Sequence, residues 1–243
     1  MGPHGRGRAL APHQARAAHD ADGTGRGRRR DGLTRPQLII LDFDGTLADS
    51  APWFAGELNR VARRFGFREV GDEEMERMRR MNTAAILRFL RVPSWKLPFI
   101  ARHMRRRVAE EAASIPLFPG TRALLERLSR RAPLAIASSN SEANIRRILG
   151  RSAAQIRHYD CGASLFGKAK KFRRLIHRAE ADPRAVLCIG DELRDIEAAQ
   201  MAGSRSVAVT WGYAAAEVWV GGRPDLVVDK MDALPALLEA YLP

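Results

Sequence analysis

Two aspartates stand directly after the first strongly apolar run of the chain. Residues 38–41 read Leu-Ile-Ile-Leu, and residues 42–46 read Asp-Phe-Asp-Gly-Thr. Because residues two apart near the end of a strand point the same way, Asp42 and Asp44 can face one reacting group. Two neighbouring carboxylates disfavour double ionisation, so one can stay deprotonated as a nucleophile while the other, protonated, acts as a general acid. The segment predicts a catalytic pair, and the alternative is two solvated aspartates in a turn.

Polar residues follow two later apolar runs in the same way. Ser138 and Ser139 come after residues 134–137, and Asp191 comes after residues 185–189. Parallel sheets place their active sites at the carboxyl ends of the strands, so these residues are expected to converge with the aspartate pair on one crevice. Taken alone, a serine at a strand end is more typical of a helix cap or a turn.

The elements that would position these residues alternate between short apolar runs and longer segments. The apolar runs are residues 38–41, 134–137, 185–189, 207–209 and, shorter, 226–228. Continuous apolar runs are typical of strands buried on both faces of a parallel sheet, and the segments between them are long enough for crossover helices. The alternation predicts an α/β fold with a doubly wound parallel sheet.

A long segment with helical periodicity follows the aspartate pair. Residues 50–117 are predicted to form an inserted helical cap subdomain, whereas residues 37–49 and 118–243 form the core domain. The predicted cap helices are Pro52–Phe65, Asp72–Met81, Thr83–Leu90 and Leu97–Ala113. The many arginines of this segment are expected to lie mostly on solvated helix faces.

The first 36 residues differ in composition from the rest. They hold eight arginines against three aspartates and show no periodicity, so residues 1–36 are predicted to be a disordered Arg/Gly-rich tail. The tail contributes +5 to a net charge of +13. A positive surface attracts phosphate esters and nucleic acid alike, so the charge does not choose between these partners.

Cysteine usage and hydropathy indicate the compartment. Cys161 and Cys188 are too few and too far apart for a disulfide framework or a paired metal site, which favours a cytoplasmic protein. No apolar run approaches the roughly 18 to 20 residues of a membrane helix, so no membrane partner is expected.

In order along the chain, these segments resemble the motifs of the haloacid dehalogenase superfamily, specifically its phosphoglycolate phosphatase-like branch. The first motif of that branch, DxDGTLxDS, matches residues 42–50, and the fourth, GDxxxD, matches residues 190–195. The resemblance extends over roughly residues 37–235. It implies a Rossmann-like core with a helical cap and the activity of a magnesium-dependent phosphatase.

The resemblance also implies roles for the residues at the strand ends. Asp42 would attack phosphorus to give an aspartyl-phosphate, and Asp44 would protonate the leaving oxygen and later activate water. The Ser138 hydroxyl and the main-chain amide of Ser139 would bind phosphoryl oxygens.

A lysine is implied between the nucleophile and the phosphate. Lys168 is chosen because it directly follows a Phe-Gly pair, as in relatives of this branch. Lys170 and Lys171 are expected to begin a solvated helix face. The Lys-Pro pair found in many family members is absent here.

Magnesium is the implied cofactor. Asp42, Asp191 and the main-chain carbonyl of Asp44 would hold it, because this hard cation prefers oxygen ligands. Asp195 would support the site by bonding Lys168 or a water at the metal.

The retained Asp44 favours phosphate esters, because dehalogenase and phosphonatase relatives lack an acid at that position. The expected substrate is a small phosphorylated metabolite, with phosphoglycolate as the leading guess. Two alternatives stay open. A phosphomutase of the same superfamily shares all four motifs, and the tail of residues 1–36 could bind nucleic acid as an accessory. Nothing in the residues indicates the oligomeric state.

Overall fold

The computed structural model describes residues 36–162 and 167–241. These described residues all belong to one compact unit, residues 32–243. The predicted tail lies outside the described residues except for Pro36, and so does the phenylalanine of the Phe-Gly pair before Lys168.

The described residues form a six-stranded sheet in which neighbouring strands are parallel. The strands are β1 (Leu38–Leu41), β2 (Leu134–Ala137), β3 (Ile156–Asp160), β4 (Val186–Gly190), β5 (Arg205–Val209) and β6 (Leu226–Val228). Their order across the sheet is β3-β2-β1-β4-β5-β6. The winding reverses at β1, so a crevice is expected outside the carboxyl ends of β1 and its two neighbours.

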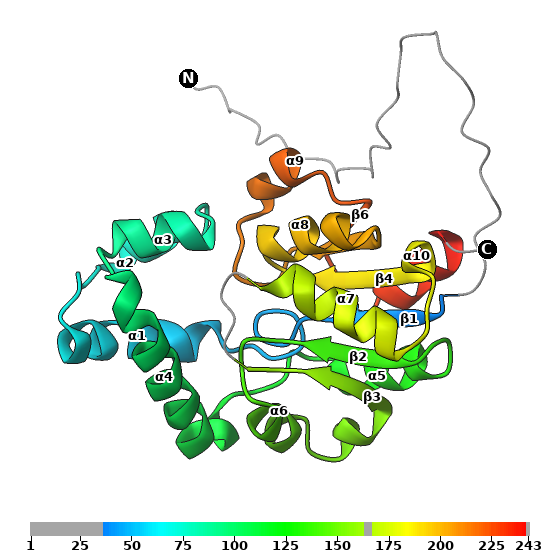
Figure 1. Cartoon of the computed structure of the whole chain (residues 1–243), viewed down its shortest axis with the longest axis horizontal. Helices are drawn as coiled ribbons and strands as arrows, with labels where there is room; N and C mark the ends of the chain where they lie inside the picture. Colours follow the sequence, from blue (N-terminus) through cyan, green and yellow to red (C-terminus); the bar gives the residue numbers. More distant parts are fainter. Residues whose placement is uncertain (1–35, 163–166, 242–243) are drawn as a thin grey trace, which may run out of the picture. The chain divides into compact units, whose positions relative to one another are not determined.

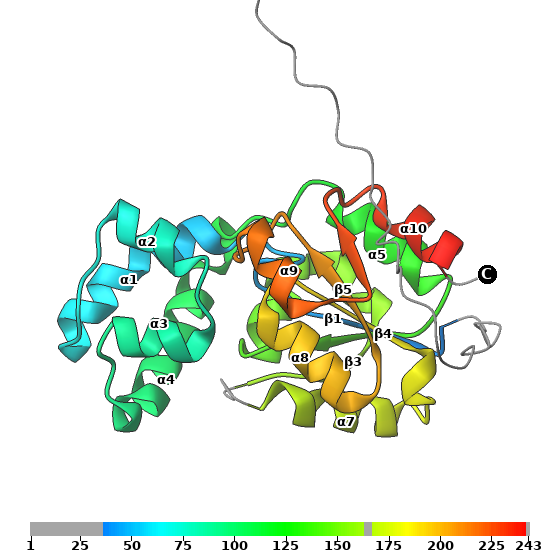
Figure 2. The ribbon, with the colours of Figure 1, turned by 90° about the horizontal axis from the view of Figure 1, so that it is seen from above.

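Helices cover both faces of this sheet. In chain order, all helices of the described residues are α1 (Ala51–Phe65), α2 (Asp72–Met78), α3 (Thr83–Phe89), α4 (Leu97–Glu111), α5 (Thr121–Ser129), α6 (Glu142–Leu149), α7 (Lys168–Arg178), α8 (Leu193–Ala202), α9 (Trp219–Gly222) and α10 (Leu234–Tyr241). Short 3₁₀ turns are η1 (Ser94–Lys96), η2 (Ala112–Ser114), η3 (Gly150–Gln155), η4 (Pro183–Ala185) and η5 (Ala216–Val218). Figure 1 shows α1 to α4 grouped together, and Figure 2 shows α7 and α8 on one face of the sheet with α5 and α10 on the other. The predicted doubly wound α/β fold is confirmed.

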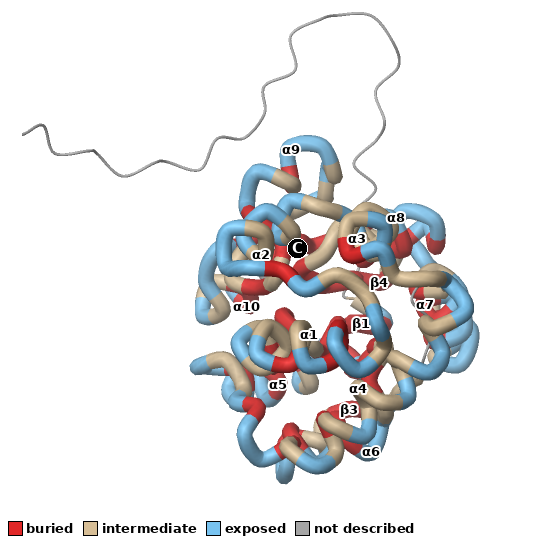
Figure 3. The backbone as a smooth tube through the Cα atoms, turned by 90° about the vertical axis from the view of Figure 1, so that its left-hand side faces the viewer, coloured by how far each residue is buried: buried red, intermediate tan, exposed pale blue. Residues whose placement is uncertain are grey.

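Strand β1 is buried on both faces, which explains its uninterrupted apolar sequence. Ile39 and Leu41 pack in one core cluster with α5, α6 and α10, whereas Leu38 and Ile40 pack in a second cluster with α7 and α8. Successive strand residues point to opposite faces, so a polar residue in β1 would face one of these clusters. Figure 3 shows β1 and β4 as buried segments.

Strand β3 was not predicted, because its sequence lacks a continuous apolar run. It lies at an edge of the sheet and pairs only with β2 among the described strands. Arg157 is exposed, and His158 and Tyr159 are half-buried. Charged and polar side chains are common on edge strands, where they discourage pairing with other chains.

Four helices, α1 to α4, follow β1 along the chain and precede α5. They begin and end within three residues of the predicted helices. Helices α2 and α3 contain no buried residue, so these two helices contribute little to a core of their own.

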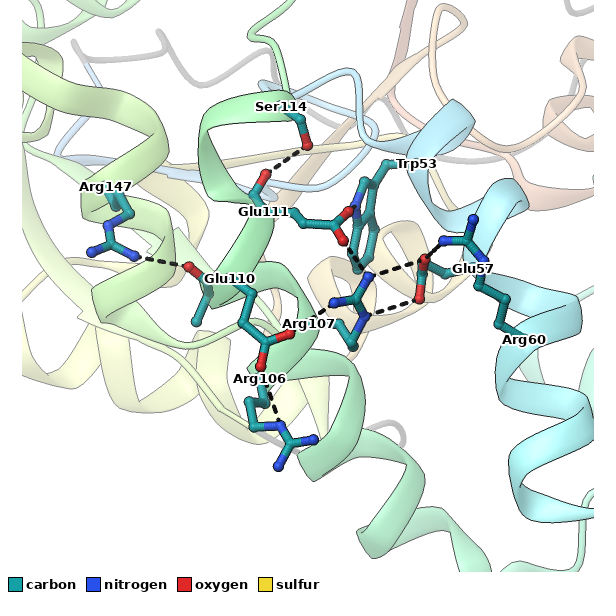
Figure 4. A network of polar contacts seen from close by, with 10 residues as sticks. Trp53, Glu57, Arg60, Arg106, Arg107, Glu110, Glu111, Ser114 and Arg147 are labelled. Atoms are coloured by element: carbon teal, nitrogen blue, oxygen red, sulfur yellow. Dashed lines mark hydrogen bonds and ion pairs between the residues drawn. The ribbon is translucent and has the colours of Figure 1, made fainter.

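A charged network joins α1 to α4 (Figure 4). The Glu57 carboxylate on α1 is 4% exposed and accepts hydrogen bonds from Arg107 on α4 at 3.2 and 3.4 Å. Arg107 also pairs with Glu110 at 2.7 Å and with Glu111. Trp53 on α1 donates from Nε1 to Glu111 at 2.7 Å. Arg107 therefore occupies the centre of the helix pair rather than a solvated face.

Helix α4 is also attached to α6 of the core. Arg147 donates to the main-chain carbonyl of Ala109 at 2.8 Å, and Asn144 donates from Nδ2 to the carbonyl of Arg105 at 2.9 Å. In the part of the chain that the structure describes, no helix has the length and apolar character needed to cross a membrane.

Candidate active site

Asp42 is the first residue after β1, and its carboxylate is 3% exposed. Its main-chain N–H donates to the Ile189 carbonyl at 2.9 Å, so the pairing of β1 with β4 continues into the aspartate. Oδ1 accepts the N–H of Phe43 at 2.8 Å, and Oδ2 lies 2.6 Å from Nζ of Lys168. A backbone amide and a buried cation thus fix the Asp42 carboxylate at the carboxyl end of the strand.

Asp44 lies in the turn that leaves β1. Gly45 makes this turn possible because its φ of +80° lies in the left-handed region that other residues disfavour. Ser138 Oγ and Asn140 Nδ2 each lie 3.5 Å from Asp44 Oδ2, which is long for a hydrogen bond. Burial and the charge of Asp42 raise the pKa of Asp44 to about 6. Asp44 is therefore easier to protonate than an ordinary aspartate, as a general acid requires.

Lys168 begins α7, and its ammonium is held between two carboxylates. Nζ lies 2.6 Å from Asp42 Oδ2 and forms an ion pair with Asp195 Oδ1. Oδ2 of Asp195 accepts the main-chain N–H of Glu192 at 3.0 Å. Burial disfavours the charged form of Lys168, but Asp195 and Asp42 offset this effect and raise its pKa. Asp195 thus holds the lysine beside Asp42.

Asp191 follows β4 and is fully buried. Thr46 donates from Oγ1 to Asp191 Oδ1 at 2.7 Å, and the main-chain N–H of Tyr213 donates to Oδ2 at 2.8 Å. Two donors from different loops therefore set the orientation of this carboxylate.

The buried carboxylates form a cluster whose chemistry fits a divalent cation. Oxygens of Asp42, Asp191 and Asp195 lie within 4.8 Å of one another. Burial, followed by the charges of Glu192, Asp42 and Asp195, raises the pKa of Asp191 well above its ordinary value. Burial also raises the pKa of Asp195 to about 6, despite the charge of Lys168. Negative charge thus exceeds what Lys168 offsets, and an all-oxygen donor set suits Mg²⁺.

The end of β2 contributes Ser138 and Asn140. Ser138 is 2% exposed, and its Oγ accepts the N–H of Asn140 at 3.1 Å. Oδ1 of Asn140 accepts the N–H of Ser141 at 2.9 Å and Nδ2 of Asn144 at 3.1 Å. These two bonds orient the Asn140 amide with its NH₂ group toward Asp44. An asparagine after a strand is also a common turn residue, so the sequence alone gives Asn140 no definite role.

The expectation that Lys171 lies on a solvated face is wrong. Lys171 is 3% exposed, and its Nζ donates to the main-chain carbonyls of Ser138 at 2.5 Å and Gly162 at 2.7 Å. Lys170 is exposed. Residues three apart on a helix share a face, so Lys171 follows Lys168 toward the sheet while Lys170 points away. This spacing is the signal that would have identified it.

The loop after β5, which includes residues 211–213, encloses the acidic cluster. Trp211 donates from Nε1 to the Thr46 carbonyl at 3.0 Å. A Cβ atom on Gly212 would lie 2.3 Å from Cβ of Asp191 and 2.4 Å from the carbonyl oxygen of Gly45. Glycine is therefore required at position 212 for the loop to approach the site this closely.

Tyr213 connects this loop to the helices α1 and α2. Its hydroxyl lies 3.2 Å from Ser50 Oγ, and its ring packs edge-on against Phe54 with centroids 6.1 Å apart. Arg79 donates from Nε to the Tyr213 carbonyl at 3.1 Å, and the Arg79 carbonyl accepts the N–H of Ala215, also at 3.1 Å. The inserted helices thus contact the loop that orients the cluster.

Two comparisons with known sequences agree. The profile of a family described as haloacid dehalogenase-like hydrolase matches residues 39–209. A phosphoglycolate phosphatase of Synechococcus elongatus is 33% identical over 207 residues, which cover 84% of this chain and 98% of that protein.

Solved structures resemble the fold. A predicted phosphatase from Clostridium acetobutylicum superposes with a TM-score of 0.73 at 18% identity, covering 85% of this chain and 100% of that one. CbbY from Rhodobacter sphaeroides, in complex with phosphate, superposes with a TM-score of 0.65 at 23% identity, covering 82% and 96%. At these identities the two structures establish the fold alone.

Proposed function

Because this chain belongs to the haloacid dehalogenase-like hydrolases, we propose that it is a magnesium-dependent phosphatase that cleaves a small phosphomonoester with Asp42 and Asp44. At the coarser level it is a phosphatase of the phosphoglycolate phosphatase-like type. Phosphoglycolate is the proposed substrate, since the relative from Synechococcus elongatus carries that name.

The observation that carries this proposal is the unequal environment of the two aspartates. The Lys168 ammonium lies 2.6 Å from the Asp42 carboxylate, so a buried cation contacts the proposed nucleophile. The pKa of Asp44 is instead raised to about 6, which favours the protonated form of a general acid. One carboxylate is thus prepared to attack and the other to donate a proton.

In the proposed reaction, Asp42 and Asp44 act in two steps. An oxygen of Asp42 forms a bond to phosphorus as the bond to the ester oxygen breaks, and Asp44 gives its proton to that oxygen. Water then attacks phosphorus, Asp44 takes a proton from it, and the bond to Asp42 breaks. The hydroxyl of Ser138 and the N–H of Ser139 are proposed to bind the phosphoryl oxygens through both steps.

Asp42, Asp191 and the main-chain carbonyl of Asp44 are the groups proposed to hold Mg²⁺. When bound, the ion supplies positive charge against the phosphoryl oxygens. Lys168 adds a second charge, and Asp195 keeps its ammonium in place.

The inserted helices are proposed to be a cap that selects the substrate. We assign residues 50–117 to the cap and residues 37–49 and 118–243 to the core. The contacts of Arg79 and Phe54 with Tyr213 support this assignment, because they place α1 and α2 next to the loop that orients Asp191. Closure of a cap expels water and positions a small substrate.

The test is release of free phosphate from a panel of phosphorylated metabolites that includes phosphoglycolate, with Mg²⁺ or with EDTA. Asp42→Asn should lower kcat at least about a thousandfold, since it removes the nucleophile. Asp232→Asn is the matched control, because Asp232 is exposed and outside the site. Full magnesium-dependent turnover by Asp42→Asn would contradict the mechanism.

Analysis of the products tests the first alternative, and RNA binding with and without the tail tests the second. A phosphomutase would yield an isomerised sugar phosphate without free phosphate. An accessory role of residues 1–36 in nucleic-acid binding would appear as a salt-sensitive RNA affinity that vanishes on deletion of the tail while turnover persists.

A further inference from the structure

Lys171 is a buried cation to which the proposed reaction gives no part. It lies one turn after Lys168 on α7 and is 3% exposed. Its Nζ donates to two main-chain carbonyls, those of Ser138 and Gly162. Burial lowers its pKa, and an exposed position would avoid that cost.

The two carbonyls belong to the loops that leave β2 and β3. The N–H of Ser138 still pairs with the Asp160 carbonyl at 3.3 Å, and the N–H of Gly162 donates to the Asn140 carbonyl at 2.7 Å. Lys171 therefore closes a set of bonds that fastens the loop after β2 to its neighbour.

The bond to the Ser138 carbonyl fixes the peptide between Ser138 and Ser139. No peptide bond among the described residues is cis, so the N–H of Ser139 points opposite to that carbonyl, away from Lys171. Among the described residues, this N–H has no acceptor. The Oγ of Ser138 lies 3.5 Å from Asp44 Oδ2.

We propose that Lys171 is a positioning residue that presents the Ser139 N–H to the phosphoryl group. This role depends on the proposed function in one respect, namely that the anion bound at the site is a phosphoryl group. A donor held in place before the anion arrives needs no reorganisation, and loss of one such donor typically slows a reaction by ~10²–10³. Without Lys171, the peptide can rotate and the donor is no longer fixed.

The test compares Lys171→Met with Lys170→Met, the exposed neighbour on the same helix. Binding of inorganic phosphate in the presence of Mg²⁺ is measured by titration calorimetry, with near-ultraviolet circular dichroism as the check of folding. We expect Lys171→Met to weaken phosphate binding about tenfold or more and to lower kcat, and Lys170→Met to change neither. A folded Lys171→Met protein that binds phosphate as tightly as the wild type overturns the proposal.

Lys171→Gln separates positioning from charge, and it serves as the test variant if Lys171→Met does not fold. The Gln amide keeps a donor but lacks the charge. If Lys171 acts by positioning, Lys171→Gln binds phosphate more tightly than Lys171→Met. If Lys171→Gln is the only variant tested, its phosphate affinity should lie within about threefold of that of the wild type. Equal losses in the two variants, or a full loss in Lys171→Gln alone, would mean that only charge matters and would overturn the proposal.

Failure of the proposed function gives a different result. In that case wild-type protein releases no phosphate from any ester, yet the comparison of phosphate binding among the Lys171 variants remains decisive.

Discussion

Asp42 and Asp44 differ in chemistry because different neighbours surround them, although they are two residues apart. A cation contacts Asp42, whereas Asp44 has long contacts to Ser138 and Asn140 and a pKa raised to about 6. Both environments come from other elements, since Lys168 lies on α7 and Ser138 follows β2. The motif supplies the carboxylates, and the fold separates their roles.

Gly212 gives a prediction at the scale of one atom. A Cβ at this position would lie 2.3 Å from Asp191, so Gly212→Ala must displace the loop or the carboxylate. We expect a loss of about 1–3 kcal/mol in the free energy of unfolding. We also expect a ~10–100-fold rise in the Mg²⁺ concentration for half-maximal activity. Magnesium titrations of turnover and urea unfolding measure the two effects.

Gly221→Ala is the control for this substitution, because a Cβ at Gly221 would meet nothing within 4 Å. Its stability and magnesium requirement should match those of the wild type. If Gly212→Ala behaved like Gly221→Ala, the contact of the loop with Asp191 would not matter for the metal site.

The cysteines give a prediction about the reactivity of their thiols. Burial raises the pKa of the Cys161 thiol to about 12 and also raises that of Cys188. A raised pKa keeps the thiol in its protonated, unreactive form. At pH 8 the fraction of Cys161 present as thiolate is therefore about one in 10⁴, whereas about a quarter of a free cysteine is thiolate. Alkylation by iodoacetamide, followed by mass spectrometry, should be slow in native protein and rapid in urea. Fast labelling of Cys161 in the native protein would mean that the loop after β3 opens readily.

The candidate aspartates Asp42 and Asp44 stand out in the sequence because a strand end and a rare pattern of residues mark them. Lys171 was missed, because the run Lys-Ala-Lys-Lys is typical of a solvated helix start and only the three-residue spacing from Lys168 distinguishes Lys171 from Lys170. Gly212 and Tyr213 lie far from Asp191 in the chain, and their contact depends on the pairing of β4 with β5.

Among the elements, burial decides what the sequence reveals. Strand β1 is buried on both faces and was predicted with its observed bounds, Leu38–Leu41. Strand β3 has an exposed arginine and half-buried side chains, so it carries no apolar run although its backbone pairs with β2. An edge strand with polar side chains is therefore missed by an apolar pattern, whereas β6, at the other edge, keeps its apolar run and was predicted.

The pairing of α1 with α4 gives a prediction about elements. Glu57 is 4% exposed and binds Arg107, whereas Arg63 and Glu69 form an exposed ion pair in the same helical segment. Burial of the Glu57 carboxylate removes competing water, so we expect a coupling energy of about 1–3 kcal/mol for Glu57 with Arg107. For Arg63 with Glu69 we expect less than about 1 kcal/mol. Double-mutant cycles by chemical unfolding measure both.

The substitutions for these cycles are Glu57→Gln and Glu69→Gln, which keep size, and Arg107→Gln and Arg63→Gln, which shorten the side chain; all four remove charge. Equal coupling in the two pairs would mean that the network in Figure 4 does not hold α1 against α4. Strong coupling would make the two helices a unit that moves as one body if the proposed cap closes.

Over the whole molecule, the charge of the chain and the charge of the site have opposite signs. The protein carries a net charge of +13, which favours the approach of an anionic substrate. The candidate site instead gathers Asp42, Asp191 and Asp195 in buried positions. Positive charge far from the cluster cannot replace a cation inside it, because an opposite charge favours buried carboxylates most within about 4–6 Å.

Mg²⁺ should therefore stabilise the whole protein. A ligand that binds only the folded state at 100 times its Kd adds about 2.7 kcal/mol to the free energy of unfolding. We expect the melting temperature to rise with Mg²⁺ and to fall in EDTA, as measured by differential scanning calorimetry. Asp191→Asn is the informative variant, because Asn Oδ1 can still accept the Tyr213 N–H while Nδ2 donates to Thr46. Because the substitution removes one of several crowded negative charges, Asp191→Asn should be at least as stable as the wild type in EDTA. Its melting temperature should hardly change when Mg²⁺ is added. A full response to Mg²⁺ in that variant would place the metal away from Asp191, since the stabilisation can arise only from groups that bind the ion in the folded state.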